Sequence, residues 1–159
     1  MKIPESDYQI VQLSDDFYHV YKSPPHEELL KKNNRPYTCL LFQTHYDFFI
    51  CIPYRTEITH FYAYRFKKSS RSQKHKSGLD YTKRAIINNN KFIDDKTVVI
   101  DKDEYNETIK AIQKIKQDAL KYVEDYIAHI NGNNLLAHQE FNRRYTYSTL
   151  KYFHNELGI

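Results

Sequence analysis

The chain has 159 residues, of which 28% are charged and 15% are aromatic, with 15 Tyr, 9 Phe and no Trp. This length predicts one domain with a single core over residues 1–159, and the composition excludes a disordered chain. The formal net charge of +4 is modest, so nucleic-acid binding would depend on where the positive charge lies rather than on its sum.

The first third of the chain favours strands around one short helix. Residues 8–21 alternate apolar and polar side chains, which predicts short strands. A short helix is predicted over residues 24–32, because two prolines and two acids open this segment and two lysines close it. The apolar runs 37–42 and 48–53 flank a polar segment and predict an antiparallel hairpin.

Strands continue to residue 100, and helices follow. Residues 62–66, 85–87 and 98–100 are further strand candidates. From Asp103 to residue 130, apolar side chains recur three or four positions apart, which predicts one long amphipathic helix with Asp103 as N-cap and Gly132 at its C-terminal end. The tail predicts one or two more helices. Strands followed by helices indicate an α+β fold with a curved, mostly antiparallel sheet.

The sequence predicts a protein of a reducing compartment. No apolar run approaches the roughly 18–20 residues that span a bilayer, and residues 1–7 are too polar for a signal peptide. Cys39 and Cys51 lie in apolar segments without CxxC spacing, so we expect two core residues rather than a disulfide or a zinc site. A cytoplasmic location without membrane contact is therefore expected.

Positive charge is concentrated between residues 65 and 84, a stretch that we call the basic tract. Asp80 is its only acid, and its cations are Arg65, Lys67, Lys68, Arg71, Lys74, Lys76, Lys83 and Arg84. Interspersed serines and nearby aromatic residues offer phosphate donors and stacking surfaces, a combination typical of single-stranded RNA binding. The alternative interpretation is a solvated loop.

Few catalytic motifs are present. The sequence has no GxxxxGK, HExxH or GxSxG pattern. A polar group directly after a predicted strand remains, namely Tyr54, Arg55, Thr56 and His60. These residues suit RNA cleavage by the RNA's own 2′-hydroxyl, which requires an acid or base and cations around the phosphorane but no metal. His60 could equally be a structural histidine, since eight His are scattered through the chain.

Three motifs in order carry a family resemblance. They are Asn-Arg-Pro-Tyr at 34–37, Ile-Pro-Tyr-Arg-Thr at 52–56 followed by His60, and Ser-Gly-Leu-Asp-Tyr-Thr-Lys at 77–83. Over residues 33–88 the chain resembles the toxins of type III toxin–antitoxin systems, with the CptN branch closest and ToxN and AbiQ more distant.

The resemblance implies a compact, strongly curved sheet flanked by helices. It also implies a metal-independent endoribonuclease that needs no cofactor and leaves 2′,3′-cyclic phosphate and 5′-hydroxyl ends. Cellular RNA would be the substrate. The antitoxin would be a small, repeat-derived pseudoknot RNA, bound to the toxin in a closed protein–RNA assembly.

The resemblance also assigns site residues. Thr56 takes the place of the family hydroxyl that contacts the scissile phosphate or the 2′-hydroxyl, and Arg35 takes the place of a family cation. Ile58 stands where the ToxN branch has a lysine, so another cation or His60 must replace it. We predict His60 as acid or base and Arg55 as charge stabiliser. The predicted catalytic set is Arg55, Thr56, His60 and Lys83, and the predicted RNA-binding set is Lys31, Arg35, Tyr54, Arg65, Lys67, Lys68, Arg71, Lys74, Lys76, Asp80 and Tyr81.

Within these sets, Asp80 is expected to orient a cation, and Tyr81 could equally be a core residue. Three other functions remain open at this point. A non-catalytic RNA-binding module would need the basic tract alone. A metal-dependent nuclease would need clustered acids, for which Asp94, Asp95, Asp101 and Asp103 are candidates, although loop and cap roles suit them better. A protein inhibitor with an exposed helix is the third.

Overall fold

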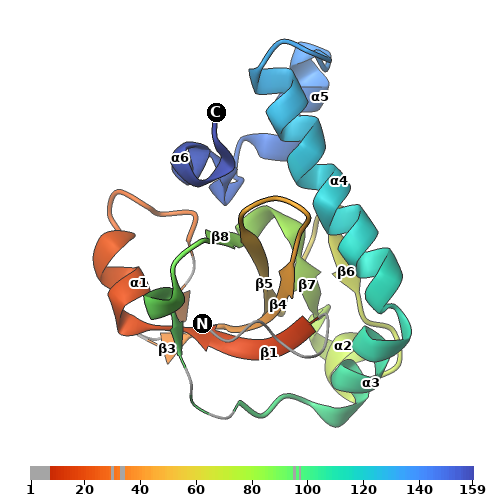
Figure 1. Cartoon of the computed structure of the whole chain (residues 1–159). Coiled ribbons are helices and arrows are strands. Elements are labelled where there is room, and N and C mark those ends of the chain that lie inside the picture. Colours follow the sequence, from red (N-terminus) through yellow and green to blue (C-terminus); the bar gives the residue numbers. More distant parts are fainter. Residues whose placement is uncertain (1–7, 30, 33–34, 95, 97) are drawn as a thin grey trace.

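A seven-stranded antiparallel sheet forms the centre of the computed structural model, which describes residues 8–29, 31–32, 35–94, 96 and 98–159 (Figure 1). The strand order is β6-β7-β5-β4-β1-β9, and β8 pairs with the first half of β5. The strands are β1 (Tyr8–Leu13), β4 (Thr38–Gln43), β5 (Phe49–Arg55), β6 (Ala63–Arg65), β7 (Gly78–Asp80), β8 (Ala85–Ile87) and β9 (Ile93–Asp94). The expected α+β fold is confirmed, with an open sheet that is not strongly curled.

The predicted hairpin is confirmed as β4 and β5, which pair from Cys39 opposite Pro53 to Gln43 opposite Phe49. Most side chains of both strands are buried, as expected for strands covered on both faces. The strand candidates at 62–66 and 85–87 are confirmed as β6 and β8. The 98–100 candidate is wrong, because these residues have no ladder partner in the described structure, and β1 pairs instead with β9.

The strands predicted over residues 8–21 are confirmed in part, as β1, and the helix predicted over residues 24–32 is wrong. Residues 15–20 form a helix, α1 (Asp15–Val20), because the Ser14 hydroxyl accepts a hydrogen bond from the Phe17 amide and two acids occupy the first turn. Residues 24–29 form turns instead of a helix, and β2 (Lys31–Lys32) pairs with β3 (Arg35–Pro36) in a separate two-stranded sheet. The apolar–polar alternation over residues 8–21 therefore hid the helix N-cap at Ser14, and the charge pattern over residues 24–32 suggested a helix that does not form.

The long helix predicted after residue 103 is two helices, α3 (Lys102–Lys110) and α4 (Ile112–Ile130), which meet at Ala111. The N-cap is Asp101 rather than Asp103, since the Asp101 carboxylate accepts the Glu104 amide at 3.0 Å. The break gives α3 an orientation of its own, so that α3 buries polar residues while α4 buries apolar ones. The predicted end is confirmed, because Gly132 has a φ of +74° and its amide donates to the His129 carbonyl.

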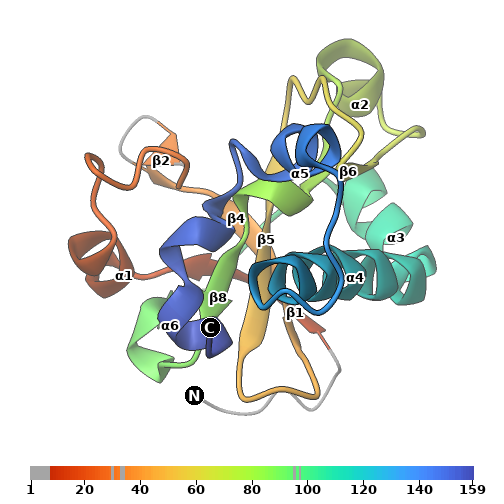
Figure 2. The ribbon, with the colours of Figure 1, turned by 90° about the horizontal axis from the view of Figure 1, so that it is seen from above.

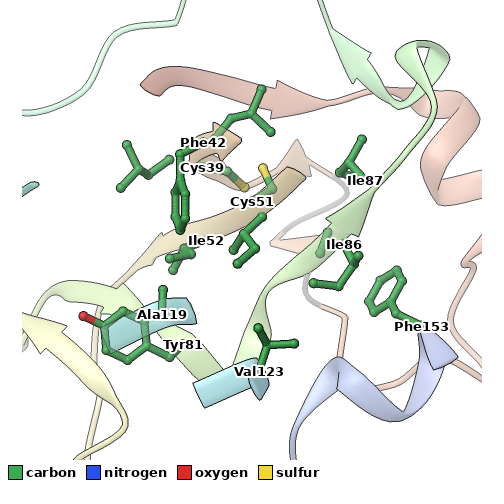
Figure 3. Packing of buried hydrophobic residues seen from close by; sticks show 14 of the residues in the cluster. Cys39, Phe42, Cys51, Ile52, Tyr81, Ile86, Ile87, Ala119, Val123 and Phe153 are labelled. Atoms are coloured by element: carbon green, nitrogen blue, oxygen red, sulfur yellow. The ribbon is translucent and has the colours of Figure 1, made fainter. Parts of the chain in front are cut away.

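One hydrophobic cluster joins the sheet to α4 and to the C-terminal segment. The predicted tail helices are α5 (His138–Tyr145) and α6 (His154–Leu157), with a 3-10 turn, η3 (Thr149–Tyr152), between them. Figure 3 shows Ala119 and Val123 of α4 and the Phe153 ring around the apolar side chains of the sheet. Cys39 and Cys51 are buried and free, which confirms them as core residues.

The helices α2 (Ser70–His75) and α3 lie at one end of the molecule, and α1 lies at the other end (Figure 2). Within the described ranges, no helix combines the length and the apolar character needed to cross a bilayer.

Candidate functional site

The C-terminal end of β5 separates the predicted catalytic residues onto two faces. Successive side chains of a strand point to opposite sides, so Tyr54 and Thr56 face one way and Arg55 faces the other. Thr56 lines a pocket of about 570 Å³, whereas Arg55 binds Asp80. Arg55 and Thr56 therefore belong to different sites.

The pocket that contains Thr56, here called the Thr56 pocket, lies between the sheet, α2 and the start of α3. Its polar lining includes Thr38, Tyr54, Thr56, Arg71, Asp101 and Glu104. Thr56 is half-buried, and the Arg71 side chain is 45% exposed. The Thr56 hydroxyl and the Arg71 guanidinium therefore line the same pocket. The two residues lie far apart in the sequence and do not belong to one motif.

Tyr54 forms part of the pocket wall. Its ring is buried, its hydroxyl lies 2.9 Å from the Thr108 hydroxyl, and burial raises its pKa. The predicted RNA contact of Tyr54 is thus restricted to the pocket side of its ring.

The basic tract is partly helical. The Ser69 hydroxyl caps α2 by accepting the Ser72 amide at 2.9 Å, and the helix ends at Lys76, whose φ is +49°. The cations in the centre of the tract are all exposed, namely Lys67, Lys68, Arg71, Lys74 and Lys76. In the described part of the chain, only Arg71 among these five has an ion-pair contact within 4.0 Å, at 3.8 Å from Glu104.

Two buried acids of α3 hold the tract in place. Glu107 accepts the backbone amides of Lys67 at 3.1 Å and of Lys68 at 2.5 Å. Glu104 accepts the Ser77 hydroxyl at 2.7 Å and the Ser69 hydroxyl at 3.4 Å. Because these carboxylates are used mainly by amides and hydroxyls, the lysine side chains stay in solvent.

The sequence reasoning missed Glu104 and Glu107. Their spacing of three positions places both on one helix face, and that face is the one that α3 buries. The three-residue spacing of these two acids was the available signal.

On the opposite side of β5, a buried carboxylate gathers three groups. Asp80 is fully buried, and its carboxylate lies 2.5 Å from Arg55 Nη1 and 3.2 Å from His60 Nε2. Thr82 donates both its amide and its hydroxyl to Asp80 Oδ1, at 2.9 and 2.6 Å. Burial alone would raise the pKa of Asp80, but the hydrogen bonds from His60 and Thr82 and the charge of Arg55 outweigh it and lower the pKa to about 2.

Both ring nitrogens of His60 have partners. Nδ1 accepts the Tyr62 amide at 3.1 Å, so Nε2 carries the proton that is directed at Asp80. Arg65 is half-buried and donates to the His60 carbonyl at 2.8 Å. In this arrangement His60 positions its loop, and Asp80 orients cations as expected but has no surface for RNA contact.

The last part of the basic tract lies away from both sites. Lys83 Nζ donates to Glu28 at 2.5 Å and to the Tyr147 carbonyl at 2.7 Å. Arg84 is fully buried, with its guanidinium 4.8 Å from the centre of the Tyr122 ring. Tyr81 is buried too, which agrees with the core alternative. The structure therefore does not bring Lys83 together with Thr56 or His60.

Two predicted RNA contacts cannot be placed at side-chain level. Lys31 lies in β2 and Arg35 in β3, but their side chains lie outside the described part of the structure.

Two of the four acids offered for a metal site have other roles. Asp101 caps α3, and Asp94 accepts the Lys96 amide at 2.9 Å; Asp95 lies outside the described residues. Over those residues, no group of three or more His, Cys, Asp or Glu side chains is arranged to hold a metal ion.

The chain was also compared with known proteins. No family model matches it, and no similar curated protein or solved structure was found.

Proposed function

We propose that this chain is a metal-independent endoribonuclease toxin of a type III toxin–antitoxin system, and that the Thr56 pocket is where it cuts single-stranded RNA. One observation carries the proposal: Thr56 and Arg71 line the same pocket. Thr56 is the hydroxyl that the family resemblance assigns to the scissile phosphate, and Arg71 belongs to the exposed basic tract. The cleavage site and the RNA-binding surface are thus continuous.

In the proposed reaction, the 2′-hydroxyl oxygen of the RNA bonds to the adjacent phosphorus while the bond from phosphorus to the 5′-oxygen breaks. Water takes the proton of the 2′-hydroxyl and gives one to the leaving 5′-oxygen, and the products have 2′,3′-cyclic phosphate and 5′-hydroxyl ends. Thr56 donates a hydrogen bond to a phosphate oxygen. Arg71 stabilises the charge that builds up on the phosphorane. His60 lies on the opposite side of β5 and is bonded to Asp80 and the Tyr62 amide, so Thr56 and Arg71 have the leading roles.

The basic tract provides affinity in this proposal. Its exposed lysines contact RNA phosphates, and the buried Glu104 and Glu107 keep those lysines available. The substrate is cellular RNA in the cytoplasm. The antitoxin is a small, repeat-derived pseudoknot RNA that covers both the tract and the pocket in a closed protein–RNA assembly.

Cleavage of an end-labelled single-stranded RNA in excess EDTA tests the proposal, with product ends identified by phosphatase and kinase treatment. We expect cyclic phosphate ends and a loss of about 10²–10³-fold for Thr56→Val, as for removal of one transition-state donor. The matched control is Thr59→Val, an exposed threonine in the same loop, which should cut normally. Cleavage that requires added magnesium, or equal losses in both variants, would contradict the proposal.

A non-catalytic RNA-binding module is the second candidate, favoured by the two hydrogen bonds that occupy the His60 ring. It predicts a folded chain that binds RNA with steep salt dependence and cuts none. RNA integrity after prolonged incubation distinguishes the two candidates.

A further inference from the structure

A second hollow lies beside the loop that carries His60. It has a volume of about 260 Å³, and its wall includes Phe61, Tyr62, Tyr81, Asp118, Lys121 and Arg144. We call it the aromatic pocket. It combines rings, two cations and two carboxylates, Asp118 and Asp125, and Asp125 pairs with both cations, Lys121 at 2.9 Å and Arg144 at 3.1 Å. Neither the Thr56 pocket nor the proposed cleavage step uses any of these groups.

Phe61 is the most exposed of the large apolar side chains in the described structure, at 91%. Its neighbours are held firmly, because His60 bonds to Asp80 and the Tyr62 hydroxyl accepts a hydrogen bond from Arg143 at 3.2 Å. The loop therefore exposes the Phe61 ring to water while hydrogen bonds hold the residues on either side of it. Burying such a ring is favourable, so a stacking partner that covers it gains affinity.

The hydroxyl of Tyr81 is a second and independent sign of a missing ligand. Tyr81 is 94% buried and lines the aromatic pocket, and its hydroxyl has no hydrogen-bond partner among the described residues. Figure 3 shows this hydroxyl directed away from the apolar side chains of the core. A buried hydroxyl without a hydrogen-bond partner is destabilising, so a polar group that reaches it stabilises the bound state.

Asp118 supplies the acceptor. It lies close enough to Tyr81 that, after burial, its charge is the next largest cause of the raised pKa of that phenol. The Asp118 side chain is 42% exposed, and its ion pair with Lys114 at 3.0 Å is a surface pair, which is weak and readily exchanged. The Asp118 carboxylate is thus accessible beside the exposed Phe61 ring.

We propose that the aromatic pocket binds a single unpaired guanine of the RNA. Guanine is the base whose Watson–Crick edge presents two adjacent N–H donors, and these match the two oxygens of Asp118. Phe61 stacks on the base. A local shift of the wall brings the guanine carbonyl to the Tyr81 hydroxyl. This inference rests on the RNA binding of the proposed function and adds its base preference.

Binding of short uridine-rich RNAs, labelled with a fluorophore and differing at one central base, tests the inference by anisotropy. The full chain should bind the strand with guanine about tenfold more tightly than the strand with adenine, which corresponds to about 1.4 kcal/mol. Inosine lacks the 2-amino donor and should fall between them. Asp118→Asn should remove this order, whereas Asp103→Asn, an exposed acid of α3, should keep it.

The ring has its own matched control. Phe61→Ala should weaken every strand by about tenfold, as for the loss of one stacked base, and Tyr147→Ala, an exposed tyrosine at 71%, should not. Equal affinity of the wild-type chain for guanine, adenine and inosine strands would overturn the guanine pocket and leave the cleavage proposal intact. Failure to bind any of the strands would overturn both. Light scattering provides one more check, because a dimer that Phe61→Ala converts to monomer would assign Phe61 to self-association and overturn the pocket.

Discussion

The buried Asp80 carboxylate allows a quantitative prediction for Asp80→Asn. Its pKa falls from an ordinary value of 3.8 to about 2 in the folded chain. Each pKa unit corresponds to about 1.4 kcal/mol, so ionisation of Asp80 contributes about 2 kcal/mol to the free energy of unfolding. Because the folded pKa is the lower one, this contribution is complete above the unfolded pKa and is lost as the pH falls toward 2.

Asp80→Asn should therefore have two effects. Removing the charge leaves Arg55 without its partner and lowers stability at neutral pH by about 3–5 kcal/mol, as for other broken buried pairs. The difference between wild type and variant should then shrink by about 2 kcal/mol between pH 6 and pH 2. Urea unfolding followed by circular dichroism at several pH values measures this difference.

Asp103→Asn is the control, since Asp103 is an exposed acid, and its difference from wild type should stay small and nearly constant. A difference between wild type and Asp80→Asn that does not change with pH would refute the assignment of Asp80 as a carboxylate held ionised by Arg55, His60 and Thr82.

Three further outcomes follow from the same contacts. Replacing Lys67, Lys68 and Lys74 with Ala should reduce the slope of log affinity against log salt by about 2, because each phosphate contact on a single strand contributes roughly 0.7. The same change at the exposed Lys22, Lys91 and Lys151 is the control and should leave the slope unaltered. Equal slopes in the two variants would show that the basic tract does not contact RNA phosphates. His60→Ala should lower the free energy of unfolding by about 1–2 kcal/mol. It should lower the single-turnover cleavage rate by less than tenfold at a permissive temperature. A 10²–10⁴-fold loss of rate in a folded variant would instead assign His60 as acid or base. Gly78→Ala would place a Cβ 2.3 Å from the Tyr64 carbonyl oxygen and should destabilise the fold by about 1–3 kcal/mol. This loss should exceed that of Gly132→Ala. A Gly78→Ala melting temperature equal to that of wild type would contradict this packing.

The sequence predicted those helices and strands that depend on residues close together in the chain. The β4–β5 hairpin could be predicted because both runs are apolar and the turn is polar, and the C-terminal end of α4 could be predicted from Gly132. The break at Ala111 could not, because alanine suits a helix interior and the apolar spacing continues across it. The break depends instead on what α3 packs against.

The candidate site illustrates the same limit. The basic tract was visible as a run of charge, but its fixed shape comes from Glu104 and Glu107, which lie far along the chain. The grouping of Arg55 with Thr56 overlooked the two-residue period of a strand, which already places neighbouring side chains on opposite faces. Arg71 and Thr56 line the same pocket, and the fold rather than the local sequence brings them there.

A double-mutant cycle of Thr56→Val and Arg71→Gln, measured by single-turnover cleavage in EDTA, tests most directly whether both side chains act on one phosphate. If they do, each single variant loses about 10²-fold or more, and the double variant loses far less than the product of the two. Losses that multiply, or either single variant cutting at the wild-type rate, would contradict a shared site in the Thr56 pocket.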